Sequence, residues 1–207
     1  MTSAFTDAAA TWNQRFSDPD YVFGREPNEF LRVQTPLLTP AGRVLCVADG
    51  EGRNSVWLAR QGMRVEAFDV AETGVAKARK LAEEAQVSVD YHVSDCDSWE
   101  WRDNAYDAIV AIFIQFAGPD MRARMFANMV RALKPGGLLI LQGYTPKQLE
   151  YKTGGPGELS HLYTADLLRE AFASLETVEL TEYEAELSEG ARHAGMSALI
   201  GLVARKP

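Results

Sequence analysis

Short apolar runs alternate with segments of helical periodicity along the chain, and this alternation predicts an α/β fold built on a parallel sheet. Five runs are bounded by polar or turn residues, and we predict strands at 43–48, 64–68, 88–93, 106–113 and 138–143. Between them, apolar side chains return every three or four positions, at Val75, Ala78, Leu81, Ala82 and Ala85 and again at Met125, Phe126, Met129, Val130 and Leu133. Each stripe predicts a helix that covers one face of the sheet.

The boundaries of several elements are marked by turn and capping residues. Gly118-Pro119-Asp120 predicts the start of a helix, and Lys134-Pro135-Gly136-Gly137 predicts its end. A polar, glycine-containing loop covers 144–163, and loops of this length often carry function. Thr164 then has the position of an N-cap for a helix that ends near Phe172.

The last part of the chain contains two further strand patterns, 175–187 and 196–204, separated by a short turn with Gly190. This arrangement predicts an antiparallel pair of strands. With 207 residues and 46% hydrophobic content, the chain can close one core of ordinary size. We therefore predict a single domain over 1–207.

Charge and composition narrow the class of partner. The 21 basic and 29 acidic residues give a formal net charge of −8, which argues against nucleic acid and favours a small-molecule substrate. No run approaches the roughly 20 apolar residues of a membrane span, so we expect a cytoplasmic protein. The sequence leaves its oligomeric state open between monomer and homodimer. The two cysteines and three scattered histidines lack zinc-ligand spacing, and we expect no metal.

The stretch from Val44 to Asn54, V-L-C-V-A-D-G-E-G-R-N, runs a strand into two glycines and then into a helix predicted over 52–61. Gly50 and Gly52, with Ala48 beside them, would let the backbone turn sharply and let a ligand approach closely. The helix would point its unpaired N–H groups at the same place. This pattern predicts a nucleotide-type cofactor site.

Acidic residues follow the next two strands, where ligands of open parallel sheets bind. Asp69 comes 19 positions after Gly50, the spacing of a carboxylate that binds ribose hydroxyls, although it could instead cap the next helix. Asp95, followed by Cys96, could accept an adenine amino proton or be an ordinary solvated acid. Both residues are therefore predicted to contact the cofactor.

The glycine pattern also bears on the identity of the cofactor. A dinucleotide site has the form G-x-G-x-x-G, and counting from Gly50 places Ser55 at the third glycine. Arg53 would in addition obstruct a pyrophosphate at the start of the helix. An adenosine cofactor without pyrophosphate fits better, and we predict S-adenosylmethionine, with Phe113 at the end of the fourth strand near its reactive end.

The same segments support a resemblance to a known family. Residues 44–54, Asp69, 133–137 (L-K-P-G-G) and the terminal hairpin together resemble class I S-adenosylmethionine-dependent methyltransferases. Residues 21–31 (Y-V-F-G-R-E-P-N-E-F-L), 50–54 (G-E-G-R-N), 144–146 (Y-T-P) and 153–156 (T-G-G-P) are similar to small bacterial methyltransferases of the tellurite-resistance or thiopurine-methyltransferase-like type. The resemblance spans nearly the whole chain.

The resemblance implies a Rossmann-like sheet of seven strands in the order 3-2-1-4-5-7-6, with the last strand antiparallel and helices on both faces. It implies a core over 36–207 and an N-terminal helical lid over 1–35, in which Tyr21 would contact the cofactor. Gly50 and Gly52 would approach the methionine part, Asp69 the ribose, and Asp95 with the Cys96 backbone the adenine. Two positions depart from the family, since Ala48 replaces its first glycine and Cys46 replaces a common acid.

The acceptor site is predicted around the end of the fourth strand and the later loops. Its candidate lining residues are Gln115, Phe116, Tyr144, Tyr151 and Tyr163, and the candidate bases are His161 and His193. A soft nucleophile such as a thiol or a selenium or tellurium oxyanion would need no protein base, whereas a hydroxyl or amine would.

Two other functions are consistent with the sequence. The first is a nicotinamide-dependent oxidoreductase, although the missing third glycine counts against it. The second is a non-catalytic module that binds S-adenosylmethionine. Methyl transfer from S-adenosylmethionine to a small molecule agrees best with all of the motifs together.

Overall fold

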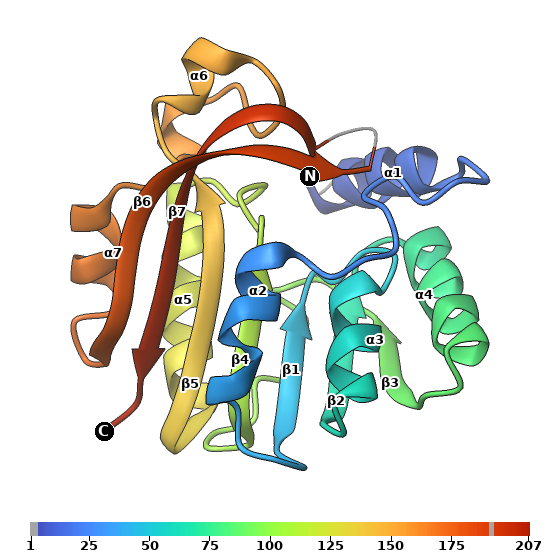
Figure 1. The fold of residues 1–207 in the computed structure, drawn as a ribbon, viewed down its shortest axis with the longest axis horizontal. Helices are drawn as coiled ribbons and strands as arrows, with labels where there is room; N and C mark the ends of the chain where they lie inside the picture. The colour runs from blue at the N-terminus through green and yellow to red at the C-terminus, as the bar shows by residue number, and fades with distance from the viewer. Residues whose placement is uncertain (1–3, 191–192) are drawn as a thin grey trace.

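The computed structural model describes residues 4–190 and 193–207 and contains a seven-stranded sheet in the order β3-β2-β1-β4-β5-β7-β6 (Figure 1). The strands are β1 (Arg43–Val47), β2 (Arg64–Asp69), β3 (Val89–Val93), β4 (Tyr106–Ile112), β5 (Leu133–Tyr144), β6 (Glu176–Glu189) and β7 (His193–Arg205). Among these strands, β7 alone is antiparallel to its neighbours, β5 and β6. The predicted α/β class and the strand order implied by the resemblance are confirmed.

Helices flank this sheet on both sides. They are α1 (Ala4–Phe16), α2 (Glu29–Gln34), α3 (Arg53–Arg60), α4 (Glu72–Glu84), α5 (Pro119–Ala132), α6 (Gln148–Tyr151) and α7 (Ala165–Ala171), with short 3₁₀ turns η1 (Thr35–Leu37) and η2 (Leu159–His161). Within the described part of the chain, no helix is both long and apolar enough to span a bilayer. Residues 1–3 of the predicted lid and 191–192 of the predicted turn lie outside the described residues.

The side chains of β1 show how the sheet is buried on two faces. Leu45 and Val47 belong to a cluster with residues of α5 and α7, whereas Val44 and Cys46 belong to a cluster with residues of α2, α3 and α4. Successive residues of a strand point to opposite faces, so an unbroken apolar run needs a cover on each side. Figure 1 shows the two helical layers.

Most predicted boundaries agree with the structure to within one or two residues, and β5 is the main exception. It begins at Leu133, which pairs with Tyr106 of β4, so the Lys134-Pro135-Gly136-Gly137 segment lies inside the strand. The register shifts between Tyr106 and Ala108, which accommodates the proline and the glycines at the start of the strand. The predicted starts of α5 at Pro119 and of α7 after its N-cap Thr164 are confirmed.

The β6–β7 hairpin is longer than the sequence predicted and positions the functional site. Pairing continues to Glu189 opposite His193, and the ribbon arches over the carboxyl ends of the parallel strands towards α1 (Figure 1). A Cβ on Gly190 would lie 2.4 Å from the carbonyl oxygen of Val22 and 2.6 Å from the backbone nitrogen of Gly24. The end of the hairpin is therefore packed against the segment that follows α1.

Candidate active site

The loop between β1 and α3 contains three residues with positive φ. They are Ala48 at 49°, Gly50 at 61° and Gly52 at 90°. A Cβ on Gly52 would lie 2.7 Å from the Cβ of Ala78 in α4 and 2.9 Å from the hydroxyl oxygen of Tyr91. Gly52 is needed for close packing of the loop, whereas Ala48 adopts the left-handed conformation that a non-glycine residue rarely takes.

Asp69 connects this loop to the end of β2. Its Oδ2 accepts the backbone N–H of Gly50 at 2.9 Å, and its Oδ1 accepts that of Ala71 at 2.8 Å. Burial raises the pKa of Asp69 to about 6 although these hydrogen bonds lower it. The N-cap position of α4 is Ala71, so Asp69 is not the helix cap.

A cavity of about 600 Å³ lies at the carboxyl ends of the parallel strands. The loop after β1 contributes Ala48, Asp49 and Gly50 to its wall, and the ends of β2 and β3 contribute Phe68, Asp69, Asp95 and Cys96. Three further lining residues are Phe113 and Phe116, which follow β4, and His193, which begins β7 of the hairpin. This is the size of an ordinary ligand pocket.

Asp49 is a carboxylate in this wall with an oxygen that lacks a partner. The Ser55 hydroxyl donates to Oδ2, and Tyr91 in turn contacts the Ser55 hydroxyl at 2.8 Å. Oδ1 is buried and has no hydrogen-bond partner among the described residues. Burial raises the pKa of Asp49 to about 7, and the nearby Asp69 charge contributes in the same direction. A buried acceptor without a protein partner can accept a hydrogen bond from a ligand or from ordered water.

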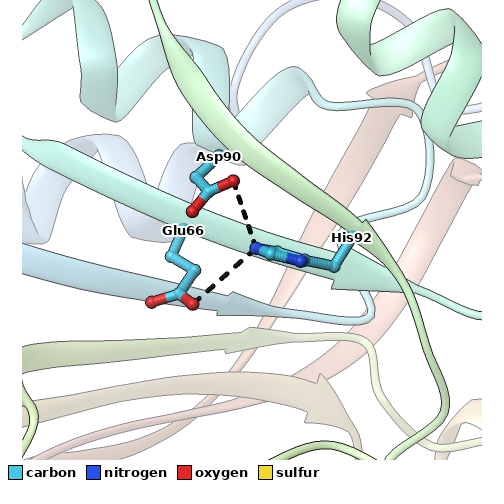
Figure 2. Close-up of side chains that lie close together, drawn as sticks. All are labelled: Glu66, Asp90 and His92. Atoms are coloured by element: carbon cyan, nitrogen blue, oxygen red, sulfur yellow. Dashed lines mark ion pairs between the residues drawn. The ribbon is translucent and has the colours of Figure 1, made fainter.

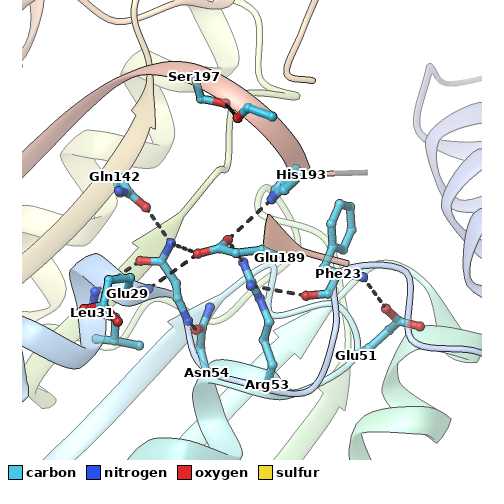
Figure 3. A network of polar contacts seen from close by, with 12 residues as sticks. Phe23, Glu29, Leu31, Glu51, Arg53, Asn54, Gln142, Glu189, His193 and Ser197 are labelled. Carbon is cyan, nitrogen blue, oxygen red and sulfur yellow. Dashed lines mark hydrogen bonds and ion pairs between the residues drawn. The ribbon is translucent and has the colours of Figure 1, made fainter. Parts of the chain in front are cut away.

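A polar network connects the glycine loop to the hairpin (Figure 3). The Arg53 guanidinium lies 2.8 Å from Oε2 of Glu189, and the side chains of both residues are almost fully buried. Oε1 of Glu189 accepts from the Asn28 amide at 3.0 Å, and the same amide donates to Gln142 at 2.6 Å. The ring nitrogen Nδ1 of His193 lies 3.7 Å from Oε2 of Glu189.

Aromatic side chains of the N-terminal segment cover one side of the cavity. Trp12, Phe16 and Phe23 all line it, and their ring centroids lie 5.4 to 6.3 Å apart. Glu51 of the glycine loop holds this segment, because its Oε2 accepts the backbone N–H of Val22 at 2.8 Å. The N-terminal segment is thereby tied to the loop that it covers.

The structure brings most of the predicted cofactor residues together. Ala48, Gly50, Asp69, Asp95, Cys96 and Phe113 all line the cavity. Gly52 does not line it and acts instead through the packing of the loop. Tyr21 is also outside the lining, and its hydroxyl donates to the carbonyl of Lys77 at 3.2 Å, whereas Phe23 lines the cavity.

Fewer of the predicted acceptor residues lie at the cavity. Phe116 and His193 line it, but Gln115, Tyr144, Tyr151, Tyr163 and His161 do not. Gln115 has a structural role. Its Oε1 accepts the backbone N–H of Tyr144 at 2.6 Å, and its Nε2 donates to the carbonyl oxygen of Tyr144 at 2.9 Å. Tyr144 and Tyr163 are buried in the core, and the hydroxyl of Tyr151 donates to Glu184 on an exposed face. Nδ1 of His161 lies 2.9 Å from the carbonyl oxygen of Gln115.

Sequence reasoning missed two groups that the structure places in the wall. Asp49 lies within the quoted glycine stretch, but its side-chain direction depends on the positive φ of Ala48. From the sequence, Arg53 is expected to obstruct a pyrophosphate, whereas in the structure its guanidinium is paired with Glu189 from a strand far away in the chain.

Asp95 has a partly structural role, since Oδ1 accepts the N–H groups of Asp97 and Ser98 at 2.7 and 2.8 Å.

One cluster among the described residues has the geometry of a metal site, and it lies away from the cavity. The ligand atoms of Glu66, Asp90 and His92 all fall within 4.8 Å of one another (Figure 2). Glu66 is already paired with the guanidinium groups of Arg43 at 2.8 Å and Arg102 at 2.6 Å. A cation would face both positive charges, and we assign no metal to this cluster.

Comparison with known proteins finds similarity to methyltransferases. A model described as a methyltransferase domain matches residues 44–137, which span β1 to the start of β5 and include the glycine loop, Asp69 and Asp95. Over these residues the chain matches a methyltransferase domain. Among curated relatives of this methyltransferase domain, the ubiquinone biosynthesis O-methyltransferase of Xanthomonas campestris is 37% identical, over 53% of this chain and 46% of its own length. The chain spans about half the length of the curated relatives it matches.

Solved structures share the fold of the methyltransferase domain over most of the chain. TehB from Haemophilus influenzae aligns with a TM-score of 0.73 and 20% identity, covering 87% of this chain and 62% of its own. The N-methyltransferase NodS from Bradyrhizobium japonicum, in complex with S-adenosyl-L-homocysteine, aligns with a TM-score of 0.72 and 15% identity, covering 96% of this chain and 98% of its own. At these identities the similarity concerns the fold.

Proposed function

We propose that this chain binds S-adenosylmethionine in the cavity and transfers its methyl group to a small-molecule acceptor. The observation that carries the proposal is the pair of buried carboxylates beside the glycine loop. Asp69 follows β2, and Asp49 keeps an unpartnered oxygen in the same wall. The pKa values of Asp49 and Asp69 are raised to about 7 and about 6 by burial, so a cationic ligand would stabilise both as anions.

The residues present fit the cofactor part by part. We assign Asp69 to the ribose hydroxyls, and the flat side chain of Phe68 with Asp95 and Cys96 to the adenine, because all four residues line the cavity. The unpartnered Oδ1 of Asp49 suits the ammonium of the methionine part. The same oxygen would repel a pyrophosphate, which counts against the nicotinamide alternative.

The chain contributes orientation and exclusion of water to the reaction. When bound, the cofactor supplies a methyl group that is activated by its sulfonium sulfur. Trp12, Phe16 and Phe23 line the cavity on the side of the N-terminal segment, which supports a role of this segment in keeping water out. Holding two reactants in line can lower a barrier by about 7 to 11 kcal/mol, so no metal is required by this scheme.

The acceptor belongs to one of two chemical classes. A thiol or a selenium or tellurium oxyanion would react without help from a base, whereas a hydroxyl would first have to lose its proton. The curated relatives are named as O-methyltransferases, which favours oxygen. His193 in the cavity wall is a group that could take the proton, and it also favours oxygen.

Calorimetry with S-adenosylmethionine and S-adenosylhomocysteine tests the cofactor, and we expect saturable binding of both. Release of S-adenosylhomocysteine in the presence of thiol, selenite, tellurite and phenolic acceptors tests turnover. A protein that binds neither compound at millimolar concentration would refute the proposal. Binding without turnover on any acceptor would support the non-catalytic module, and a fluorescence response to reduced nicotinamide cofactor would support the oxidoreductase.

A further inference from the structure

The tip of the β6–β7 hairpin places an imidazole in the cavity wall with a carboxylate behind it (Figure 3). Nδ1 of His193 is buried, has no hydrogen-bond partner within the described part of the chain and lies 3.7 Å from Oε2 of Glu189. Since His193 lines the cavity, this leaves Nε2 as the ring nitrogen that can face a ligand. A ring with a carboxylate near one nitrogen and the other nitrogen open to the cavity has the arrangement of a proton acceptor.

Glu189 is a fixed negative charge. It is held by the Arg53 guanidinium at 2.8 Å and by the Asn28 amide at 3.0 Å. Burial opposes its ionisation, but the neighbouring His193 and Arg53 outweigh burial and lower the pKa of Glu189 to about 2. Glu189 is therefore ionised throughout the neutral pH range, and it can stabilise a positive charge on the ring of His193.

His193 itself is neutral at rest. Burial lowers its pKa below the usual value, the positive charge of Arg53 acts in the same direction, and Glu189 opposes both. A further titratable neighbour is Tyr144 of β5, whose ring centroid is 5.9 Å away and whose pKa is raised by burial, so that it stays protonated. At neutral pH, His193 is thus free to take up a proton.

The surroundings of His193 select for a flat apolar molecule. Its ring centroid lies 4.5 Å from that of Phe23 and 4.4 Å from that of Phe113, and both phenylalanines line the cavity. Phe116 lines the same side. Aromatic walls pack favourably against aromatic rings, with stacked or edge-to-face geometry.

We propose that His193 is the general base for an acceptor whose nucleophile is a hydroxyl on an aromatic ring, and that Glu189 is the residue that positions it. This inference rests on the methyl transfer proposed above. A phenol of pKa about 10, like that of tyrosine, is within reach of a histidine base, whereas an aliphatic alcohol is a much weaker acid.

In the transfer step, the phenol oxygen forms a bond to the methyl carbon, and the bond between that carbon and sulfur breaks with its electron pair returning to sulfur. The phenol proton passes to Nε2 of His193, and the resulting imidazolium faces the Glu189 carboxylate. The proton leaves to solvent after the methyl ether has been released, which restores the neutral ring.

The test compares two acceptors of similar shape. Unsubstituted phenols and catechol are protonated at pH 7.5, whereas a dinitrophenol is already ionised and needs no base. We expect His193→Asn to lower kcat by about 100-fold or more on protonated phenols, the usual contribution of a general base, and much less on the ionised one. His161→Asn, a histidine outside the cavity lining, is the matched control and should leave both rates unchanged.

A second variant tests the positioning residue. Glu189→Gln removes the charge that raises the pKa of His193, so the ascending limb of the kcat–pH profile should move to lower pH while kcat on protonated phenols falls. Glu186→Gln, an exposed residue on the same strand, should change neither. The inference is overturned if His193→Asn lowers kcat equally on protonated and ionised phenols and Glu189→Gln leaves the kcat–pH profile unchanged. Both residues would then have structural roles only.

The failure of this inference can be separated from the failure of the proposed function. Calorimetry with S-adenosylhomocysteine is run on each variant, and we expect wild-type affinity for His193→Asn. If the wild type binds S-adenosylhomocysteine and methylates thiols but no phenol, the phenolic acceptor class is wrong and the proposed methyl transfer stands. If His193→Asn does not fold, His193→Gln, which keeps more of the side-chain volume, is used in the same comparison.

Discussion

Gly50 donates its backbone N–H to Oδ2 of Asp69 over 2.9 Å, so the carboxylate that ends β2 also holds the loop that ends β1. A second N–H, from Ala71, occupies Oδ1 at 2.8 Å. Each oxygen has one further lone pair for a ligand. Asp69 therefore shapes the loop and contributes to the cavity wall at the same time.

Replacing Asp69 tests its place in the cofactor site. Asp69→Asn loses the charge and one acceptor, and hydrogen bonds to charged groups contribute about 1.5 to 3 kcal/mol. We expect calorimetry to give a Kd for S-adenosylmethionine that is weaker by about 10- to 100-fold. The exposed Asp166→Asn is the control, and an unchanged Kd in Asp69→Asn would remove the ribose assignment.

Asp49 should make binding dependent on pH. Its pKa is raised to about 7 and that of Asp69 to about 6, so both carboxylates take up protons as the pH falls from 8 to 5.5. The affinity for S-adenosylmethionine is expected to fall over this range. In Asp49→Asn it should be lower at pH 8 and change less with pH. Binding of 5′-methylthioadenosine, which lacks the ammonium, should be insensitive to this substitution, and an equal loss for both ligands would contradict the assignment.

The same carboxylate should affect the stability of the ligand-free protein. Because the folded-state pKa of Asp49, about 7, is higher than its unfolded value, the folded state binds more protons between roughly pH 4 and 7. Its contribution to stability is present at low pH and is lost as the pH rises through 7. Asp49→Asn is therefore expected to raise the melting temperature at pH 8 by about 2 to 4 °C for each kcal/mol gained, and to raise it less at pH 5. A larger rise in melting temperature at pH 5 than at pH 8 would contradict a destabilising buried charge on Asp49 at pH 8.

Two glycines of similar φ separate backbone strain from packing. A Cβ on Gly52, whose φ is 90°, would lie 2.7 Å from the Cβ of Ala78, whereas a Cβ on Gly62, whose φ is 84°, would meet open space. Both alanine variants introduce strain of about 1 kcal/mol, but only Gly52→Ala also pushes the loop away from α4. We expect thermal unfolding to show a clearly larger loss for Gly52→Ala, with a loss of cofactor affinity. Equal losses for the two variants would mean that packing at Gly52 is unimportant.

The buried ion pair of Arg53 and Glu189 can be tested with a double-mutant cycle. Arg53→Met leaves a buried carboxylate without its cation, and breaking such a pair costs about 3 to 5 kcal/mol. Adding Glu189→Gln should recover part of this loss, because the unpaired charge is then gone. Urea unfolding of the two single variants and the double variant measures the coupling. Strictly additive losses would show that the two side chains do not interact.

The sequence predicted the sheet well, and most of the residues that it predicted for the cofactor line one cavity, since both depend on local patterns. Continuous apolar runs indicated the parallel strands, and glycines with an acid at fixed spacing indicated Gly50 and Asp69, which the structure joins by a hydrogen bond of 2.9 Å. Such signals are contained in neighbouring residues. They do not depend on how distant segments pack.

Fewer of the residues predicted for the acceptor line the cavity, because their positions depend on contacts between distant segments. Gln115 and Tyr144 were expected at the cavity, but they bind one another across 29 positions of sequence. His193 reaches the wall only because β6 and β7 extend to Glu189 and His193, beyond the predicted ends at 187 and 196. Periodicity alone does not reveal where a hairpin bends or what it covers.

Two sides of the cavity wall come from distant parts of the chain, because the long β6–β7 hairpin reaches the cavity. The carboxylates beside the glycine loop come from β1 and β2, whereas His193 and Glu189 come from the arch formed by the last two strands. A substitution in the last two strands therefore changes one side of the cavity without touching the loop that holds Asp49 and Asp69.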